Sequence, residues 1–262
     1  MSTQTIVVKI GGSTLGHSDT SLADIVTLEQ EGVRVVVVHG GGSEVSAWLK
    51  RLGLGTQFVD GLRVTGADEL PVVTAVLAGL VNKQLVCRLR SLGGNAVGLS
   101  GVDGGLVKAS IQNPSLGYVG QVERTDPTVL RQLLDGGFTP VVSPISAGEA
   151  HGGASLLNVN ADDTAAEIAL ALNANKLVFL TDVPGIMDEK RAVYSRLTAS
   201  EADGLIADGT IEGGMIPKAR ACIVASRSTW ETRIIDGTAE HALLQECETS
   251  PGGTTIVRDE LA

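Results

Sequence analysis

The chain has 262 residues, of which 43% are hydrophobic and only 3% aromatic, and it carries a net charge of −10. This composition excludes a disordered chain and predicts a globular protein with a core of aliphatic side chains. Such an acidic chain is a poor match for a protein that binds nucleic acid over its whole surface, so a phosphate ligand would need a local group of lysines and backbone N–H groups.

The cysteines and the apolar runs indicate where the protein resides. Cys87, Cys222 and Cys247 lie far apart without CxxC spacing, so they support neither a disulfide framework nor a zinc site, and they favour a reducing compartment. The N-terminal residues show no basic segment followed by an apolar one, and no apolar run approaches the roughly 18 residues of a membrane span. We therefore expect a cytoplasmic protein that does not associate with membranes.

The first 52 residues alternate between strand and helix patterns. Residues 5–10 (TIVVKI) and 33–38 (VRVVVV) predict buried strands, and glycines follow each of them. Residues 18–30 and 43–52 predict helices; in the second helix Val45, Trp48, Leu49 and Leu52 fall on one face. Strand, glycine turn and helix in this order are typical of parallel βαβ units.

The alternation continues to the C-terminus and predicts one continuous α/β unit. A long helix is expected over residues 67–92, and hairpins over residues 106–125 are expected to decorate the sheet. Val73, Val76, Leu77 and Leu80 lie on one face of the long helix and are predicted to be core rather than interface residues.

Capping signals mark two further helices. Asp126 is predicted to cap a helix that starts at Pro127 and ends at Leu134, and Thr198 and Glu201 match a capping box. The remaining expected elements are strands at residues 96–99, 139–143, 176–180, 232–235 and 254–258, and helices at residues 164–173, 198–207 and 215–226.

Four segments end a strand or open a helix with glycine, and in open parallel sheets ligands bind beyond the carboxyl ends of the strands. They are residues 9–12, 39–42 and 182–185, and Gly213-Gly214 leading to Lys218. Glycine lets backbone N–H groups approach an anion, and the N-terminus of a following helix adds positive potential. Several such turns in one chain, two of them near a lysine, favour a polyphosphate ligand.

Other sites that use short motifs are excluded. The chain contains no GxxxxGK[ST], GxGxxG or GxSxG, which argues against a P-loop enzyme, a dinucleotide dehydrogenase and an α/β-hydrolase. His17, His39, His151 and His241 have no metal-ligand spacing. His39 is interpreted as a structural residue, with an organiser of the glycine turn as the alternative, because a lone histidine needs a partner to act as a base.

Two lysines occupy positions that are unfavourable without an anion. Lys9 lies inside a buried strand, where an unpaired charge costs several kcal/mol, and Lys218 lies in the first turn of a helix, where the dipole disfavours a cation. Asp162 is the natural carboxylate to hold both. It belongs to a segment with Asn158, Asn160 and Asp163 that is richer in polar side chains than capping requires. The alternative is that the segment is only a polar turn with a helix cap, that Lys9 is a surface lysine and that Lys218 lies at a solvated helix start.

Eight strings keep the order and spacing of a known family from end to end. They are VKIGG (residues 8–12), VHGGG (38–42), GLRVT (61–65), NK (82–83), VGLSG (97–101), NVNAD (158–162), TDVPGI (181–186) and GMIPK (214–218). On these residues the chain resembles the amino acid kinase family, and within it the branch that phosphorylates N-acetylglutamate. The resemblance implies a three-layer α/β/α sandwich around a mainly parallel open sheet, with one domain over residues 1–262. An amino-acid lobe (residues 1–172) and a nucleotide lobe (residues 173–262) are expected within it.

The resemblance also implies roles for single residues, with ATP, Mg²⁺ and N-acetyl-L-glutamate as ligands. Lys9 and Lys218 would stabilise the transferred phosphoryl group, and Asp162 would orient both lysines. The amino-acid pocket would be lined by Gly41, Gly42, Arg63, Asn158 and Asn160, with Arg63 on the α-carboxylate and the N–H of Gly41 on phosphate. The nucleotide would contact Gly11, Gly12, Asp182, Val183, Pro184, Gly185, Ile186, Met187, Thr210, Ile211 and Glu212. No protein side chain is expected to ligate the metal.

Some features of the resemblance leave alternatives. The first strand begins near Thr5, and Pro251 stands where arginine-inhibited members are expected to have glycine, so a homodimer without arginine control is expected. Asn82-Lys83 and the VGLSG string also resemble kinases that act on aminoadipate or glutamate linked to a carrier protein. A nucleotide-binding sensor without catalysis is the other alternative, although Lys9, Asp162 and Lys218 together argue against it.

Overall fold

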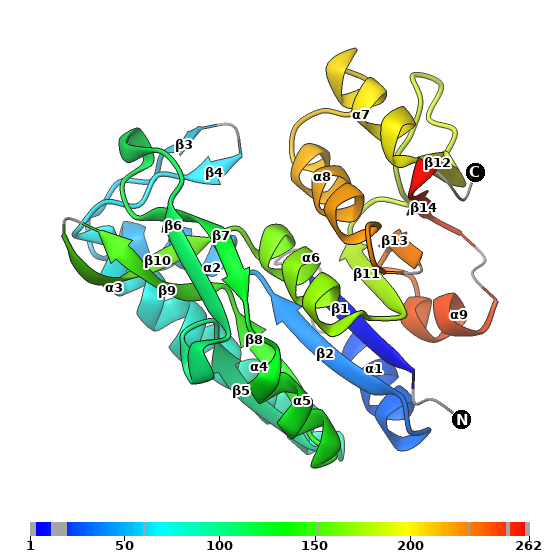
Figure 1. The fold of residues 1–262 in the computed structure, drawn as a ribbon, viewed down its shortest axis with the longest axis horizontal. Helices are drawn as coiled ribbons and strands as arrows, with labels where there is room; N and C mark the ends of the chain where they lie inside the picture. The colour runs from blue at the N-terminus through cyan, green and yellow to red at the C-terminus, as the bar shows by residue number, and fades with distance from the viewer. Residues whose placement is uncertain are drawn as a thin grey trace.

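The computed structural model of the protein describes residues 4–11, 20–59, 61–150, 152–229, 231–249 and 252–259. Within these ranges an eight-stranded sheet crosses the molecule in the order β12-β14-β13-β11-β1-β2-β8-β5 (Figure 1). Its strands are β1 (Thr5–Ile10), β2 (Arg34–His39), β5 (Ala96–Ser100), β8 (Thr139–Ser143), β11 (Lys176–Thr181), β12 (Arg196–Thr198), β13 (Glu231–Asp236) and β14 (Thr254–Val257). Neighbouring strands are parallel except β13 and β14, which confirms the mainly parallel α/β fold.

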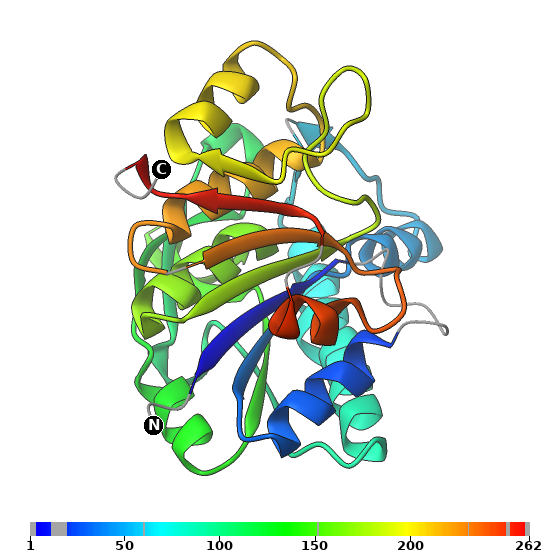
Figure 2. The ribbon, with the colours of Figure 1, turned by 90° about the vertical axis from the view of Figure 1, so that its right-hand side faces the viewer.

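Helices cover both faces of this sheet. They are α1 (Ser21–Gln30), α2 (Gly42–Arg51), α3 (Glu69–Thr74), α4 (Asn82–Ser91), α5 (Thr128–Asp135), α6 (Ala161–Leu172), α7 (Ala199–Ala207), α8 (Met215–Ala225) and α9 (Ala242–Glu248). In β2, Val35 and Val37 pack in one core with α1, α2, α4 and α9, while Val36 and Val38 pack in a second core with α5, α6 and α8. Strands buried on both faces need unbroken apolar runs, which is why VVVV reads as a central strand. Figure 2 shows α1 and α9 in front of the strands.

A second, smaller sheet lies beside the first. The expected hairpin over residues 106–125 is present as β6 (Val107–Ile111) and the antiparallel β7 (Val119–Thr125). It does not decorate the main sheet as predicted, because β9 (Ile145–Ala150) and β10 (Gly153–Val159) join it and close a small barrel. β9 and β10 were not predicted, because their small and polar residues lack a clear strand pattern. β10 is the element that delivers the chain to Asn158.

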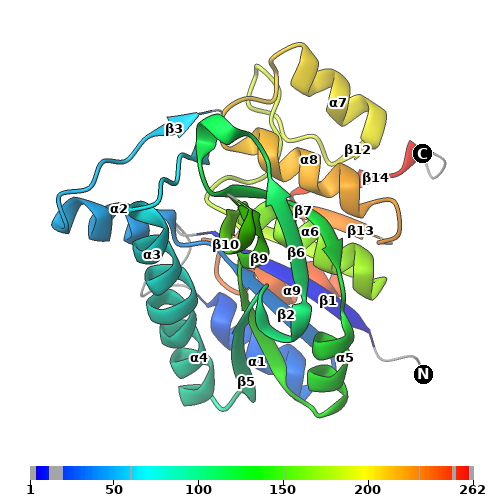
Figure 3. The same cartoon turned by 60° about the vertical axis from the view of Figure 1, so that its left-hand side comes forward.

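The long helix over residues 67–92 is present, with one unforeseen feature. α3 and α4 are joined by a π-helical segment, η2 (Ala75–Val81), and together they run along one side of the molecule (Figure 3). Val73, Val76 and Leu77 are buried as predicted, whereas Leu80 is only partly buried. Residues Glu69–Ser91, with a mean hydropathy of 1.6 in their most apolar window, meet the length and composition of a membrane span. We interpret them as a core helix of the α/β fold, because their inner face packs against the sheet.

Two predicted helix ends are wrong by one residue. Leu52 was placed on the apolar face of α2, yet it is 57% exposed because the helix ends at Arg51 and the chain turns at Gly53. α5 begins at Thr128, so Pro127 rather than Asp126 is the N-cap residue, although the Asp126 carboxylate still accepts a hydrogen bond from the Thr128 N–H at 3.1 Å. The capping box of Thr198 and Glu201 is confirmed. β3 (Phe58–Val59) and β4 (Leu62–Arg63) form a separate two-stranded sheet. The helix α9 was not predicted.

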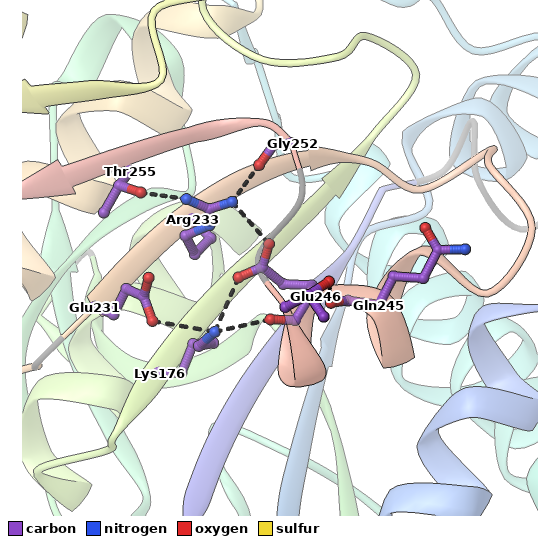
Figure 4. A network of polar contacts seen from close by, with 8 residues as sticks. Lys176, Glu231, Arg233, Gln245, Glu246, Gly252 and Thr255 are labelled. Carbon is purple, nitrogen blue, oxygen red and sulfur yellow. Dashed lines mark hydrogen bonds and ion pairs between the residues drawn. The ribbon is translucent and has the colours of Figure 1, made fainter.

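A buried ionic network holds α9 against the sheet (Figure 4). Glu246 of α9, 1% exposed, receives Lys176 Nζ at 2.9 Å on Oε1 and Arg233 Nη2 at 2.8 Å on Oε2. Lys176 also pairs with Glu231 at 3.0 Å, and Arg233 bonds Thr255 and the Gly252 carbonyl. Burial alone would lower the pKa of Lys176, but hydrogen bonds and charges from Glu246 and Glu231 raise it.

Glu246→Ala is expected to destabilise the protein by about 3–5 kcal/mol, because it leaves Lys176 and Arg233 buried without their shared carboxylate. Chemical denaturation would measure the loss. Glu248→Ala removes an exposed carboxylate from the same helix and is the control, with an expected change below about 0.5 kcal/mol. Equal stability of the two variants would contradict this account of the network.

Candidate active site

Two lysines and one aspartate from distant parts of the chain meet beyond the carboxyl end of β1. Lys9 Nζ lies 2.6 Å from Asp162 Oδ1, and Lys218 Nζ lies 3.5 Å from Asp162 Oδ2. Lys9 comes from β1, Asp162 from the first turn of α6 and Lys218 from the first turn of α8. The convergence inferred from the unfavourable positions of the two lysines is therefore present in the structure.

The local fold of α6 explains why Asp162 points to the lysines. Asn160 is the N-cap residue, and its side-chain oxygen accepts a hydrogen bond from the Asp162 N–H at 2.7 Å. Asp162 therefore sits at the positive end of the helix, where a carboxylate is favoured. Burial would raise the pKa of Asp162, but the charges and hydrogen bonds of Lys9 and Lys218 outweigh burial and lower it. Asp162 is accordingly a fixed anion that holds two ammonium groups, rather than a proton donor or acceptor.

The two lysines are held in different ways. Lys9 is 6% exposed, and its ammonium is paired with the buried carboxylate of Asp162 at 2.6 Å. Lys218 is more open, and its ammonium also donates to the Gly214 carbonyl at 3.2 Å. Lys9 is thus almost fully enclosed, whereas Lys218 is partly exposed at the start of α8. An anion bound between them would meet positive charge from two sides.

A cavity of about 190 Å³ opens next to Lys9 and Asp162. Five predicted pocket residues line it, namely Gly41, Gly42, Arg63, Asn158 and Asn160. Apolar side chains that the sequence analysis did not select complete the wall: Val45, Phe58, Leu62, Val73, Leu77, Val119, Pro144 and Val159. The cavity therefore combines one guanidinium and two amides with an aliphatic lining, which suits a small acid with a short carbon chain.

Arg63 is the only cation in that wall besides Lys9 among the residues that the structure describes. The side chain is 8% exposed; its Nη2 donates to the Gly42 carbonyl at 2.7 Å and to Ser46 Oγ at 2.8 Å, and Phe58 lies against the guanidinium at 4.6 Å. Burial lowers the pKa of Arg63, although a guanidinium stays charged in proteins. Nη1 is buried without a hydrogen-bond partner in the described part of the chain. Arg63 therefore has donor capacity left for a ligand.

The two asparagines differ in what they offer. Asn158 Nδ2 donates to Thr65 Oγ1 at 3.0 Å, which ties β10 to the segment after Arg63. The side-chain oxygen of Asn160 is used by the helix cap, so this residue contributes structure as well as a cavity wall. The alternative interpretation of this segment as a helix cap is correct for Asn160. Asn158 instead bonds Thr65, and Asp162 pairs with the two lysines.

A second cavity of about 560 Å³ lies in the C-terminal part of the chain. Of the residues expected to contact a nucleotide, Val183, Gly185, Ile186, Met187, Thr210, Ile211 and Glu212 line it. Asp182 and Pro184 do not; both are exposed, and Pro184 lines a different, smaller cavity. The wall also includes residues that the sequence analysis missed, namely Asp188, Glu189, Arg191, Asp208, Gly209 and Met215. They immediately flank the two predicted segments, so extending those segments would have found them.

Two glycine turns have steric reasons for their glycines. Gly41 has φ +147°, and a Cβ there would lie 2.9 Å from Leu77 Cδ2. Gly185 has φ +151°, and a Cβ would lie 2.7 Å from Thr254 Oγ1, the group that accepts a hydrogen bond from the Ile186 N–H. Gly11 directly follows β1 but lines neither cavity, and Gly12 lies outside the described residues.

Comparison with known proteins agrees with this geometry. The acetylglutamate kinase of Synechococcus sp. (strain CC9605) is 48% identical over 265 residues, covering 96% of this chain and 88% of that one. The acetylglutamate kinase of Dehalococcoides mccartyi (strain BAV1) is 44% identical over 259 residues, covering 98% and 95%. Among solved structures, smu.665 of Streptococcus mutans UA159 superposes with a TM-score of 0.83 at 30% identity, covering 97% of this chain and 99% of that one. Residues 4–236 match the family directly, and the chain is a member of the amino acid kinase family.

Proposed function

We propose that this protein is an acetylglutamate kinase, which transfers the γ-phosphoryl group of ATP to the side-chain carboxylate of N-acetyl-L-glutamate in arginine biosynthesis. The observation that carries the proposal is the Lys9–Asp162–Lys218 arrangement beside a small cavity that contains Arg63. The names of the relatives supply the substrate. The cavity chemistry supports it, because an N-acylated dicarboxylic acid needs a cation for one carboxylate, amide partners and an aliphatic wall.

The reaction needs positioning and charge rather than acid–base catalysis. A substrate carboxylate oxygen attacks the γ-phosphorus, a new P–O bond forms, and the bond from that phosphorus to the β,γ-bridging oxygen breaks with its electron pair going to ADP. The nucleophile is already ionised, so no proton must be removed. Lys9 and Lys218 stabilise the charge on the moving phosphoryl group from two sides, and Asp162 keeps them apart and in place.

The nucleotide is assigned to the second cavity. Met215 lines that cavity and opens α8, the helix whose first turn carries Lys218, so phosphates reaching from the cavity along this helix start would arrive at the lysines. Residues 1–172 would then form the amino-acid lobe and residues 173–262 the nucleotide lobe. We assign Mg²⁺ to the nucleotide phosphates. No group of three His, Cys, Asp or Glu side chains within the described ranges is placed to hold a metal, and both Asp162 oxygens face lysines.

We further propose a cytoplasmic homodimer. The partly buried Val72 and Leu80 lie on the long helix over Glu69–Ser91, and we assign its outer side to the contact between the two chains. Light scattering should give twice the 27.0 kDa of one chain. A monomer at micromolar concentration would contradict this part of the proposal.

Arg63→Lys is expected to raise KM for N-acetylglutamate by about 10- to 100-fold with little change in kcat, because an ammonium cannot bond Gly42, Ser46 and a carboxylate in the fixed fork of a guanidinium. Steady-state kinetics with each substrate varied in turn would measure both constants. KM for ATP serves as the internal control and should stay within about twofold. An unchanged KM for the acid would show that Arg63 does not hold it.

A hydroxylamine trap tests the function itself. Acyl phosphates react with hydroxylamine to give a hydroxamate, so the assay is run with ATP and with N-acetylglutamate, glutamate, aspartate or carbamate as free acceptor. A further reaction contains glutamate linked to a carrier protein. The proposal expects hydroxamate with N-acetylglutamate far above the others. Product only with an acid linked to a carrier protein would favour the carrier-dependent kinases, although a net charge of −10 is a poor match for an acidic partner. No ADP release with any acceptor would favour a sensor.

A further inference from the structure

Asn82-Lys83 and the strand around Gly98 line neither cavity. They meet beside His39, which directly precedes the glycine turn at residues 40–42 in the wall of the amino-acid cavity. We propose that His39 and Asn82, together with the π-helical segment η2, are positioning residues that fix this turn and, through it, Arg63 for the acid substrate. The inference rests on the proposed function, because it names what sets the shape of the same pocket.

His39 connects the turn to the core of the sheet. It is fully buried, its Nδ1 lies 2.7 Å from the Gly40 carbonyl oxygen, and its Nε2 lies 3.1 Å from Asn82 Nδ2. A carbonyl can only accept, so Nδ1 carries the proton, and Nε2 accepts from the Asn82 amide. Burial lowers the pKa of His39 to about 4, with a smaller contribution from the charge of Lys83, so the ring is neutral at physiological pH. The histidine is thus locked in one tautomer by both neighbours.

Asn82 links the histidine of β2 to two further strands, β8 and β5. Its Nδ2 also donates to the Val141 carbonyl of β8 at 2.9 Å and lies 3.3 Å from the Leu99 carbonyl of β5. Its Oδ1 accepts from Lys83 Nζ at 3.0 Å, and the same ammonium donates to the Gly98 carbonyl at 3.1 Å. This crowding explains the glycine at position 98, where a Cβ would lie 2.1 Å from Asn82 Oδ1. Every hydrogen-bonding atom of this buried amide has a partner, so it has little freedom to move.

The π-helical segment supports the turn from the other side. η2 ends at Val81, directly before Asn82, and π-helical turns are frequent at functional sites. Leu77 and Val81 of η2 both face Gly41, since a Cβ on Gly41 would lie 2.9 Å from Leu77 and 3.3 Å from Val81. Leu77 and Val81 thus contact the glycine turn itself, while the next residue, Asn82, holds His39 directly before it. The turn is thereby held by hydrogen bonds at Gly40 and by van der Waals contact at Gly41.

The position of the turn is passed on to the substrate cation. The Gly42 carbonyl accepts from Arg63 Nη2 at 2.7 Å, so a shift of residues 40–42 moves the guanidinium that is assigned to the substrate α-carboxylate. The second cavity contains none of these residues. Loss of the hydrogen bonds of His39 and Asn82 should therefore weaken binding of the acid substrate and leave ATP binding unchanged. A general loss of stability would not separate the two substrates in this way.

The test compares Asn82→Ala, His39→Ala and His39→Asn with a matched control. Asn95→Ala removes a hydrogen-bonded asparagine at the opposite end of β5, where its side chain donates to the Gly137 carbonyl at 2.9 Å. Asn82→Ala and His39→Ala should raise KM for N-acetylglutamate by about 10- to 100-fold and lower kcat, with KM for ATP within about twofold. His39→Asn should recover most of this loss, because the asparagine amide can stand where Nδ1 stands and donate to Gly40. Asn95→Ala should change neither constant.

A second measurement follows the conformation of the glycine turn by NMR, without an activity assay. Backbone amide resonances of Gly40, Gly41 and Gly42 should shift in Asn82→Ala and stay unchanged in Asn95→Ala, and labelled His39 in the unmodified protein should show the neutral Nδ1–H tautomer at pH 7. A wild-type chain without hydroxamate formation would contradict the proposed function, whatever the resonances show. An active wild type, with folded Asn82→Ala and His39→Ala variants that keep their KM values and glycine resonances, would overturn the positioning role.

Discussion

Replacing Lys9 by methionine is expected to lower kcat by about 10²- to 10³-fold, the usual cost of removing one preorganised group that stabilises transition-state charge. Methionine has nearly the length of lysine and suits a strand, so β1 should keep its place between β2 and β11. The loss follows because Lys9 is the rigid member of the pair, 2.6 Å from Asp162 and almost without solvent contact. KM values should change much less than kcat, since the charge matters most while the phosphoryl group moves.

The arginine variant of the same position sharpens this expectation. Lys9→Arg keeps the charge, but the Lys9 side chain is only 6% exposed and the space around it is too narrow for the wider guanidinium. The kcat should therefore also fall by orders of magnitude. Lys50→Met changes an exposed lysine of α2 and is the control, with an expected kcat within about twofold. Normal activity of folded Lys9→Met would mean that phosphoryl transfer does not depend on this ammonium.

Asp162→Asn is expected to have two effects, a loss of kcat by about 10²-fold or more and a loss of stability by about 3–5 kcal/mol in the free protein. An amide cannot neutralise two ammonium groups that now lie 2.6 Å and 3.5 Å from the carboxylate oxygens. ATP should restore much of the stability, because its phosphates replace the missing negative charge between the lysines. Thermal denaturation with and without ATP would measure the difference, which should be larger for the variant than for the wild type.

Asp163→Asn is the matched control, one residue further along α6. Burial, together with the charges of Asp162 and Glu167, raises the pKa of Asp163 to about 6, above the usual range of a carboxyl group. A raised carboxyl pKa means that ionised Asp163 costs stability above pH 6, so its replacement should stabilise the protein by about 1–3 kcal/mol at pH 7.5 and leave kcat nearly unchanged. If both aspartate variants lost activity equally, Asp162 would have no special role.

The fold was largely predictable because its central strands are unambiguous. The runs in β1, β2 and β11 are apolar on both faces, and only strands of a parallel sheet covered by helices need that pattern. The prediction failed where tertiary contacts decide the structure. β9 and β10 contain Gly148 and Gly153, and they become strands by closing a barrel with β6 and β7 rather than through local propensity. The π-helical turn left no local signal in AVLAGLV.

The site was predictable to the extent that single residues were out of place. A lysine inside TIVVKI and another in a first helical turn require an anion, and this reasoning led to Asp162 without coordinates. Which loop residues line a cavity was harder to infer: Asp182 and Pro184 belong to a matching string yet do not line the second cavity. The contact of His39 with Asn82, 43 positions apart, follows only from the packing of α4 on the sheet.

The place of β1 in the sheet has a consequence for how the chain matures. β1 is synthesised before β11, which begins at Lys176 and is one of its two neighbours, so the central strand keeps an open edge until β11 has been made. Contacts of such sequence separation make folding slow. Because Lys218 is added later still, recovery of activity after dilution from denaturant should lag behind recovery of helical content, and premature termination products should expose an aggregation-prone edge.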